Sequence, residues 1–197
     1  MKRGRFTVAL IGVAFILTGC GGFSSEISGI SISKKGVISE SVVENFDKDY
    51  YDKKELEQEI AAQVESYNAE NGKNAVKKKS LRVKDSVAYL GMSYATAKDY
   101  AEFNQVDLYV GDIQGAVQAG YAFEGSFFEV SKGTVKEDAP VWGSQIMSGK
   151  NYSTVVLREE LLVEVPGTIK YVSDNVRVKD KSTAVVEERQ TAYILYE

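Results

Sequence analysis

Histidine is absent from this sequence of 197 residues, and cysteine occurs only once, as Cys20. Without histidine the chain has no Ser-His-Asp or Cys-His catalytic arrangement and lacks the commonest general base near neutral pH. A single cysteine excludes an intramolecular disulfide, and zinc and copper prefer imidazole or thiolate ligands. We therefore expect no metal, no cofactor and no enzyme activity.

Proline is also scarce, with 2 residues, whereas 44% of the residues are hydrophobic and tyrosine occurs 12 times. This composition is typical of a folded chain with a packed interior. Basic residues are the minority: removing Lys2, Arg3 and Arg5 with the segment described next leaves 21 against 28 acidic residues, a net charge of about −7. This balance argues against nucleic acid as a partner and against binding of anionic lipid by a polybasic segment.

The first 19 residues have the pattern of an export signal. Lys2, Arg3 and Arg5 form a basic start without acidic residues, and a mostly apolar run follows at 6–17. At about 1.5 Å per residue this run is much shorter than the ~30 Å hydrocarbon core, so it is a poor permanent transmembrane helix. The pattern predicts a cleaved signal peptide over residues 1–19.

The apolar run ends in Leu17, Thr18, Gly19 and Cys20, which are an aliphatic residue, two small residues and a cysteine. This sequence resembles the lipobox of bacterial lipoprotein precursors. The resemblance covers residues 1–20. It implies that a diacylglyceryl group is attached to the Cys20 sulfur and that signal peptidase II cleaves between Gly19 and Cys20. The alternative is an ordinary secretory signal with a cysteine at its cleavage site, but the order and spacing of all four features favour the lipobox.

Lipid on Cys20 predicts where the protein is found. At about 0.8 kcal/mol per buried CH₂, two acyl chains contribute on the order of 20 kcal/mol, so the protein should stay on the extracytoplasmic face of the cell membrane. Residues 20–27 form the lipidated N-terminus and a short Gly- and Ser-containing linker. The remaining residues, 28–197, are enough for a single domain with its own core.

One strong helix is predicted at about 52–71. Asp52 is its N-cap, Glu55 completes a capping box and Gly72 ends the helix. Its apolar residues recur at helical spacing and share one face: Leu56, Ile60, Val64 and Tyr67. We therefore expect an amphipathic helix that lies on a sheet.

Strand-like patterns cover most of the remaining chain. The expected strands lie at 30–32, 37–43, 81–83, 87–94, 106–110 and 121–130, with short helices at 96–103 and 112–118. The C-terminal third, from 154 to 196, is rich in β-branched and aromatic residues and predicts a β-meander. Together these elements predict an α+β fold with a mostly antiparallel sheet, one main amphipathic helix and short helices.

Two local patterns have simple structural interpretations. Arg-Val-Lys-Asp occurs at 82–85 and again at 177–180, which favours shared hairpin chemistry over a duplication. Three consecutive lysines at 77–79 stand at the entry to a strand, where lysines more often discourage edge pairing than form a binding patch.

The densest acidic cluster consists of Asp47, Asp49, Asp52 and Glu55. A calcium-binding EF-hand loop that starts at Asp47 would need glycine at its sixth position and glutamate at its twelfth, where Asp52 and Gln58 stand. The cluster is therefore interpreted as a solvated turn followed by a helix cap. A carboxylate pair could serve a glycosidase without histidine, but the sequence nominates no particular pair.

The only tryptophan, Trp142, lies in an expected polar loop at 138–152 with Tyr152 at its end. An exposed tryptophan in a loop is the kind of anchor on which partners or sugars stack, so both residues are candidates for ligand or partner contact. The alternative is that Trp142 folds back beside Val141 and Ile146 and plugs the sheet, because large aromatic side chains are usually buried.

The sequence therefore predicts a membrane-anchored surface lipoprotein of the cell envelope. We expect it to act as a non-catalytic binding or structural module, whose partner beyond the membrane is an envelope protein or a cell-wall component. The alternative is a small carboxylate-dependent hydrolase that acts on envelope glycan. A concave cleft with two facing carboxylates would favour the hydrolase.

Overall fold

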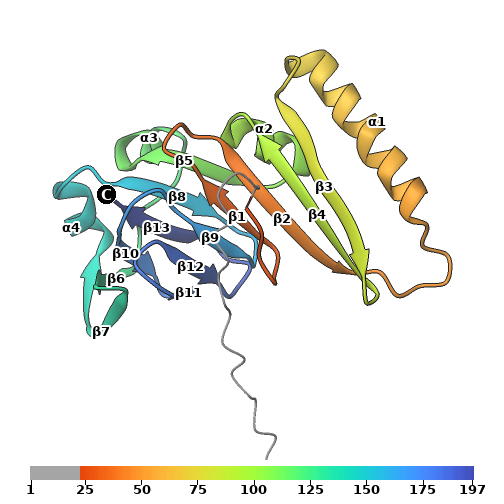
Figure 1. Ribbon diagram of the computed structural model, residues 1–197. Helices are drawn as coiled ribbons and strands as arrows, with labels where there is room; N and C mark the ends of the chain where they lie inside the picture. The colour runs from red at the N-terminus through yellow and green to blue at the C-terminus, as the bar shows by residue number, and fades with distance from the viewer. Residues whose placement is uncertain (1–22) are drawn as a thin grey trace, which may run out of the picture.

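Two β-sheets and four helices make up residues 23–197, the part of the chain described in the computed structural model (Figure 1). The predicted α+β class with one main helix is confirmed, and the sheets are mostly antiparallel. The predicted signal peptide and Cys20 lie outside the described residues. Within residues 23–197, no helix is both long and apolar enough to cross a membrane.

The larger sheet, sheet A, has seven strands in the order β11-β12-β9-β1-β2-β4-β3. All neighbouring strands are antiparallel except β1 and β9, which are parallel. The strands are β1 (Gly29–Ile32), β2 (Ile38–Asn45), β3 (Val76–Lys84), β4 (Val87–Tyr94), β9 (Leu162–Glu164), β11 (Val176–Val178) and β12 (Thr183–Val186). The predicted hairpin is therefore the β3–β4 pair, and β3 is an edge strand.

The second sheet, sheet B, has six antiparallel strands in the order β5-β8-β13-β10-β6-β7. The strands are β5 (Leu108–Asp112), β6 (Ser126–Ser131), β7 (Thr134–Trp142), β8 (Ser153–Leu157), β10 (Ile169–Ser173) and β13 (Ala192–Tyr196). Every residue of β13 is buried. Its Ile194 packs into a core shared with sheet A, whereas Tyr193 and Leu195 pack into a second core with α3 (Ile113–Gln118) and α4 (Gly143–Ser148). Sheet B is thus a middle layer, covered on both faces.

The main helix, α1 (Lys53–Asn71), begins as predicted. The Asp52 carboxylate accepts hydrogen bonds from the backbone N–H groups of Lys54 and Glu55, at 2.7 and 2.9 Å. Only Ile60 is buried, and the other apolar residues of the predicted stripe, Leu56, Val64 and Tyr67, are half-buried against the core. The helix lies beside β3 at the far end of sheet A (Figure 1).

The short helix α2 (Ala97–Asn104) fills the space between the two sheets where sheet A extends beyond sheet B. Its Tyr100 and Phe103 pack on Tyr94 of β4, with ring centroids 5.1 and 5.8 Å apart. Thr96 caps α2 and Asp112 caps α3, through hydrogen bonds to the backbone N–H groups of Asp99 (3.1 Å) and Gly115 (2.7 Å). The two short helices at 96–103 and 112–118 are therefore confirmed.

Two sequence predictions are wrong. The C-terminal third is not a meander, because its strands are divided between the sheets: β8, β10 and β13 belong to sheet B, and β9, β11 and β12 to sheet A. The expected loop at 138–152 contains the end of β7 and the helix α4. Pro140 is tolerated there because β7 is an edge strand, where a missing backbone donor breaks no sheet hydrogen bond.

The repeated Arg-Val-Lys-Asp sequence stands at two hairpins. The first copy ends β3 at the turn into β4, and the second ends β11 at the turn into β12. In the second turn the Asp180 carboxylate accepts hydrogen bonds from the backbone N–H groups of Ser182 and Thr183, at 2.8 and 3.0 Å. Aspartate thus has a local role in closing a hairpin, in line with shared turn chemistry.

Candidate ligand groove

A groove of about 390 Å³ opens between the first half of α1, the loop before it and the outer end of sheet A. Its floor is apolar, three aromatic rings line one end, and carboxylates stand around it. The floor is formed by Val42, Leu81, Ala88 and Leu90. The aromatic end is formed by Phe46, Tyr50 and Tyr51, and the carboxylates are those of Glu44, Asp52, Glu55 and Glu59. We refer to this site as the α1 groove.

The floor is apolar because of the strand register. Val42 of β2 pairs with Leu90 of β4, which pairs with Leu81 of β3, so the three side chains lie in one row across the sheet. Alternate residues of a strand point to the same face, and this face is the one that α1 and α2 cover. The next residue of β4 on that face, Ala88, is small and fills little of the space beneath the helix.

The aromatic end comes from the loop between β2 and α1. The Tyr51 ring lies 5.0 Å from that of Phe46 and 4.9 Å, edge-on, from that of Tyr50. Tyr50 is 76% exposed and Tyr51 42% exposed, although both are large apolar rings. Backbone hydrogen bonds hold the loop: the Phe46 N–H donates to the Ser86 carbonyl in the β3–β4 turn, and the Tyr51 N–H donates to the Lys48 carbonyl. Exposed aromatic rings beside an apolar groove are typical of a binding site.

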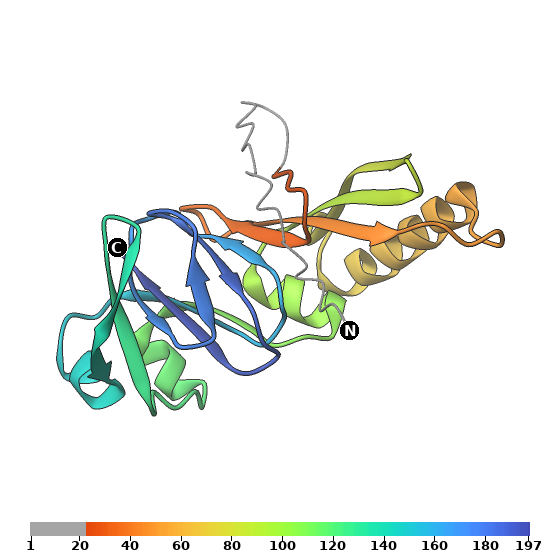
Figure 2. The same ribbon diagram turned by 90° about the horizontal axis from the view of Figure 1, so that it is seen from below.

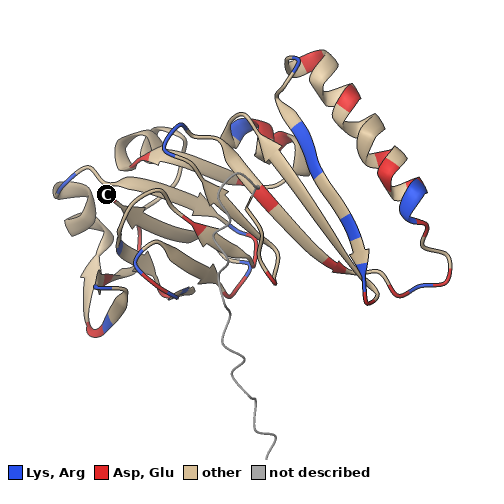
Figure 3. Cartoon of the chain, in the orientation of Figure 1, with Lys and Arg blue, Asp and Glu red and all other residues tan. Residues whose placement is uncertain are grey.

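The groove is strongly acidic. Four carboxylates line it, and no lysine or arginine is among its lining residues. The pKa of the Tyr51 hydroxyl is raised, first by the neighbouring Tyr50 and also by Asp47, so the ring stays neutral at physiological pH. Neutral tyrosine faces and carboxylates both attract cations. Figure 3 shows acidic residues along α1.

Two sets of contacts fix α1 to the edge strand β3, one from Asn68 in the second half of the helix and one from Glu57 in the first half. The Asn68 side chain makes two hydrogen bonds of 2.9 Å to Val76 of β3, one donated to its carbonyl and one accepted from its N–H. Lys78 of β3 forms an ion pair with Glu57 of α1. Both contacts involve β3, the edge strand that lies along the helix.

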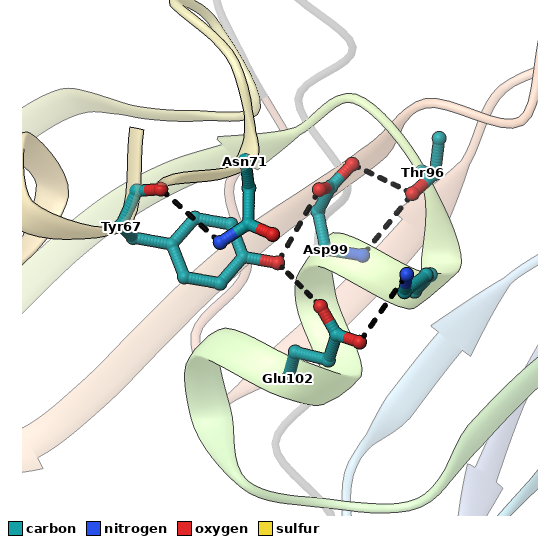
Figure 4. Close-up of polar contacts among 6 residues, drawn as sticks. Tyr67, Asn71, Thr96, Asp99 and Glu102 are labelled. Carbon is teal, nitrogen blue, oxygen red and sulfur yellow. Dashed lines mark hydrogen bonds and ion pairs between the residues drawn. The ribbon is translucent and has the colours of Figure 1, made fainter. Parts of the chain in front are cut away.

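Tyr67 connects α1 to α2 (Figure 4). Its hydroxyl donates to carboxylate oxygens of Glu102 at 3.0 Å and Asp99 at 3.3 Å. The Thr96 hydroxyl donates to Asp99 at 2.6 Å. Burial, followed by the bond to Glu102, raises the pKa of Tyr67 well above its usual range, so it remains a donor. This network holds one end of α1 in place and belongs to the support of the groove.

A second set of carboxylates, Glu40 and Glu159, is half-buried near Tyr100 of α2. The Tyr94 hydroxyl donates to Glu40 at 2.5 Å, and Tyr94 and Tyr100 are only 1% and 3% exposed. Burial raises the pKa of Glu40, and it also raises the pKa of Glu159, whose carboxylates both act on Tyr100. The two carboxylates have different surroundings: Glu40 accepts the Tyr94 hydroxyl, whereas Glu159 lines a pocket of about 390 Å³ together with Asp107 and Arg158.

Trp142 and Tyr152, the residues predicted to contact a ligand or partner, occupy different settings. Trp142 is 59% exposed at the end of β7, so the expectation that it plugs the sheet is wrong. Its backbone N–H donates to Gln145 at 3.0 Å and thereby caps α4. Tyr152 is half-buried, and its ring packs edge-on against Tyr171 at 5.6 Å. Within residues 23–197 no aromatic contact joins the two, and their role in binding stays a prediction.

The α1 groove was missed by the sequence interpretation, although its signals are present. The acidic cluster at 47–55 was assigned to a solvated turn, and Asp52 does cap α1 as that assignment requires. The adjacent Tyr50 and Tyr51 are the additional signal, because two aromatic residues directly before a helix cap are rarely needed for the turn itself. In the described part of the chain, no group of three or more Cys, Asp or Glu residues could hold a metal ion.

Comparison with protein-family models, with curated proteins and with solved structures finds no match for this chain.

Proposed function

We propose that the protein is a lipid-anchored, non-catalytic binding module on the extracytoplasmic face of the cell membrane. Its ligand is a segment of another envelope protein that carries lysine or arginine next to apolar side chains, and the α1 groove receives this segment. The observation that carries the proposal is the combination of an apolar floor, exposed tyrosines and uncompensated carboxylates in one groove.

The composition of the groove determines the class of ligand. Apolar side chains of a ligand would stabilise the complex by removing Val42, Leu81 and Leu90 from water. An anionic ligand would be repelled by Glu55 and Glu59. A cation placed between these carboxylates and the Tyr51 ring is attracted by the negative charges and by the face of the ring. Each cation–π contact is worth about 0.5 to 2 kcal/mol, depending on how far the cation is desolvated.

The size of the groove limits how much of the ligand it contacts. A volume of about 390 Å³ holds only a few side chains, so binding depends on one or two anchor residues rather than on a large interface. We therefore expect modest affinity for a short peptide and a strong dependence on the two exposed tyrosines.

The test of the groove is calorimetric titration of the lipidated protein, in nonionic detergent, with a blocked peptide of alternating lysine and leucine. Wild-type protein should bind it, and Tyr50→Ala/Tyr51→Ala should weaken binding by about tenfold or more, because two aromatic contacts are lost. A peptide of alternating glutamate and leucine tests charge selectivity and should not bind. Trp142→Ala is the matched control, because it removes an exposed aromatic ring from β7 of sheet B, which does not line the α1 groove. This variant should bind like wild type.

Two results would contradict the groove assignment. Equal binding of the lysine and glutamate peptides would show that the carboxylates do not select the ligand. Loss of binding in Trp142→Ala but not in Tyr50→Ala/Tyr51→Ala would move the site to Trp142.

The lipid anchor has its own test. Cells grown with a labelled palmitate analogue should incorporate the label into wild-type protein, and Cys20→Ala should lose both the label and stable membrane association without unfolding. The reason is that Cys20 precedes every core residue of the described chain. Unlabelled wild-type protein, or Cys20→Ala protein that keeps the label, would rule out the lipobox.

A further inference from the structure

The edge strand β3 carries an unusual density of positive charge. Five of its nine residues are basic: Lys77, Lys78, Lys79, Arg82 and Lys84. They form the main basic band of the outer part of sheet A, next to the acidic helix α1 (Figure 3). The strand register decides which of these side chains point toward the helix and which point away.

One lysine points toward the helix and the other basic residues point away. Lys78 pairs with Met92 and contacts Glu57, so it is on the side of α1. Lys77, Arg82 and Lys84 pair with Ser93, Tyr89 and Val87, which alternate with the buried residues of β4.

A register shift brings Lys79 to the same side. The β3–β4 ladder shifts between Lys78 and Ser80. A Cβ built on Gly91 would lie 2.8 Å from the Ser80 hydroxyl and 3.7 Å from the Lys79 Cβ, so both residues project on the side of Gly91, away from α1. Four basic residues, Lys77, Lys79, Arg82 and Lys84, therefore share one face, which we call the basic face.

The basic face has no opposing charge on the neighbouring strands. The residues of β1, β2 and β4 that point to it are uncharged: Gly29, Ser31, Ser39, Ser41, Val43, Asn45, Val87, Tyr89, Gly91 and Ser93. Asp85 at the hairpin tip lies 3.7 Å from Lys84, Glu164 is on β9, and Glu26 is exposed in the segment before β1. The Arg82 guanidinium lies 4.5 Å from the Tyr89 ring centroid, so a cation and an aromatic ring are stacked in the middle of the face.

The described chain also begins on this face. Phe23 and Ser24 line a shallow hollow of about 830 Å³ together with Lys79, Arg82 and Tyr89. In Figure 2 the first described residues leave sheet A on the side away from α2. Cys20 precedes Phe23 by three residues, which span at most about 11 Å of extended chain. A lipid on Cys20 would therefore hold the basic face close to the bilayer.

We infer that the basic face docks on the anionic headgroups of the membrane to which Cys20 is anchored, and that the α1 groove consequently points away from the bilayer. The inference rests on the proposed lipid anchor but not on the proposed ligand. Phosphate groups accept hydrogen bonds and charge from Lys77, Lys79 and Arg82, and Tyr89 suits the headgroup level, where aromatic rings gather.

The net negative charge of the chain does not oppose this docking. Charges are screened over about 8 Å at physiological ionic strength, so a membrane surface responds to the nearest side chains and not to the sum over the protein. The carboxylates of α1 lie on the other side of the sheet. The net charge of the whole chain therefore does not predict whether anionic lipid binds, because the fold places basic and acidic residues on opposite faces of sheet A.

The experiment compares lysine acetylation of the lipidated protein on two kinds of vesicle, pure phosphatidylcholine and phosphatidylcholine with roughly a third phosphatidylglycerol. On anionic vesicles, the acetylation rates of Lys77, Lys79 and Lys84 should fall by about fivefold or more relative to neutral vesicles. Lys53 and Lys54 at the start of α1 are internal controls and should react equally on both. High salt should remove the protection.

Matched variants assign the effect to this face. Lys77→Gln/Lys79→Gln/Arg82→Gln should abolish the protection of Lys84, whereas Lys34→Gln/Lys35→Gln, in the exposed turn between β1 and β2, should retain it. Flotation with both kinds of vesicle but equal acetylation on each would overturn the inference and leave the anchor intact. Failure to float with either kind would instead refute the anchor. Equal protection of Lys53 and Lys54 would also overturn the inference, because it would show no preferred face.

Discussion

The two faces of the outer part of sheet A are made by the same three strands and differ in almost every property. On the face toward α1, Val42, Leu81 and Leu90 form an apolar floor with carboxylates around it. On the opposite, basic face, Lys79 and Arg82 stand among serines and glycine. Residues one position apart thus belong to different chemical surfaces, and neither composition nor net charge of the chain describes either one.

The contrast follows from the period of two in a β-strand. A face that is covered by a helix selects apolar residues, while the alternate positions remain free to take any polar residue. In β3 those free positions are mostly basic, whereas four carboxylates, Glu44, Asp52, Glu55 and Glu59, line the groove on the other face. Charge is therefore segregated between the two faces of the sheet. In the two proposals above, one face binds an envelope protein and the other docks on the membrane.

The sharpest way to break this contrast is to place the same charge on each face in turn. Val76→Asp buries an unpaired carboxylate at a fully buried position and should cost several kcal/mol, enough to unfold much of the protein. Lys77→Asp, one residue later and exposed on the basic face, should change stability by only about 0.5 kcal/mol. Thermal unfolding followed by circular dichroism compares them, and equal loss in both variants would mean that the two faces are misassigned.

A smaller effect is expected when α1 is loosened from the sheet. Asn68→Ala leaves the N–H and carbonyl of buried Val76 without partners and should cost about 1 to 3 kcal/mol. Amide hydrogen exchange should increase in α1 and β3 but not in β13, which lies in the other sheet. Asn71→Ala is the control, because Asn71 is exposed and bonds only within the helix. Uniformly faster exchange that includes β13 would argue against a locally attached helix.

The smallest expected effect concerns the half-buried Glu40. Its pKa is raised by burial, so the folded state favours the protonated form. The stability linked to Glu40 is complete below the ordinary glutamate pKa of about 4.3 and is lost as the pH rises through the higher folded value. Glu40→Gln should therefore be more stable than wild type at neutral pH, with the difference vanishing below about pH 4. Denaturant unfolding over this range checks it, and a variant less stable than wild type at neutral pH would show that the charged form is favoured.

Local features of the fold were predictable from the sequence, and long-range ones were not. The cap at Asp52 was predicted because it depends on a side chain and backbone N–H groups two or three residues away. The pairing of β9 with β1 was not predicted, because these strands are far apart in the chain and apolar composition does not specify a partner. The prediction of a C-terminal β-meander was wrong for the same reason.

The candidate site shows the same limit. Tyr50, Tyr51 and the acidic residues beside them were visible in the sequence, but the floor of the groove comes from Val42, Leu81 and Leu90 on three separate strands. Only the strand register brings these parts together. Conversely, Trp142 stands out in the sequence as a single large aromatic residue, yet its exposure depends on α4, which was expected to be loop.

The most direct test of the two-faced arrangement is energy transfer from a single fluorophore to acceptor lipids in anionic vesicles. The dye is attached to Ser80→Cys on the basic face or to Glu59→Cys at the α1 groove, and the lipid proposed for Cys20 would keep that thiol from reacting with the dye. Efficient transfer from position 80 and weak transfer from position 59 is the predicted result. Equal transfer from both positions, or stronger transfer from position 59, would contradict the account.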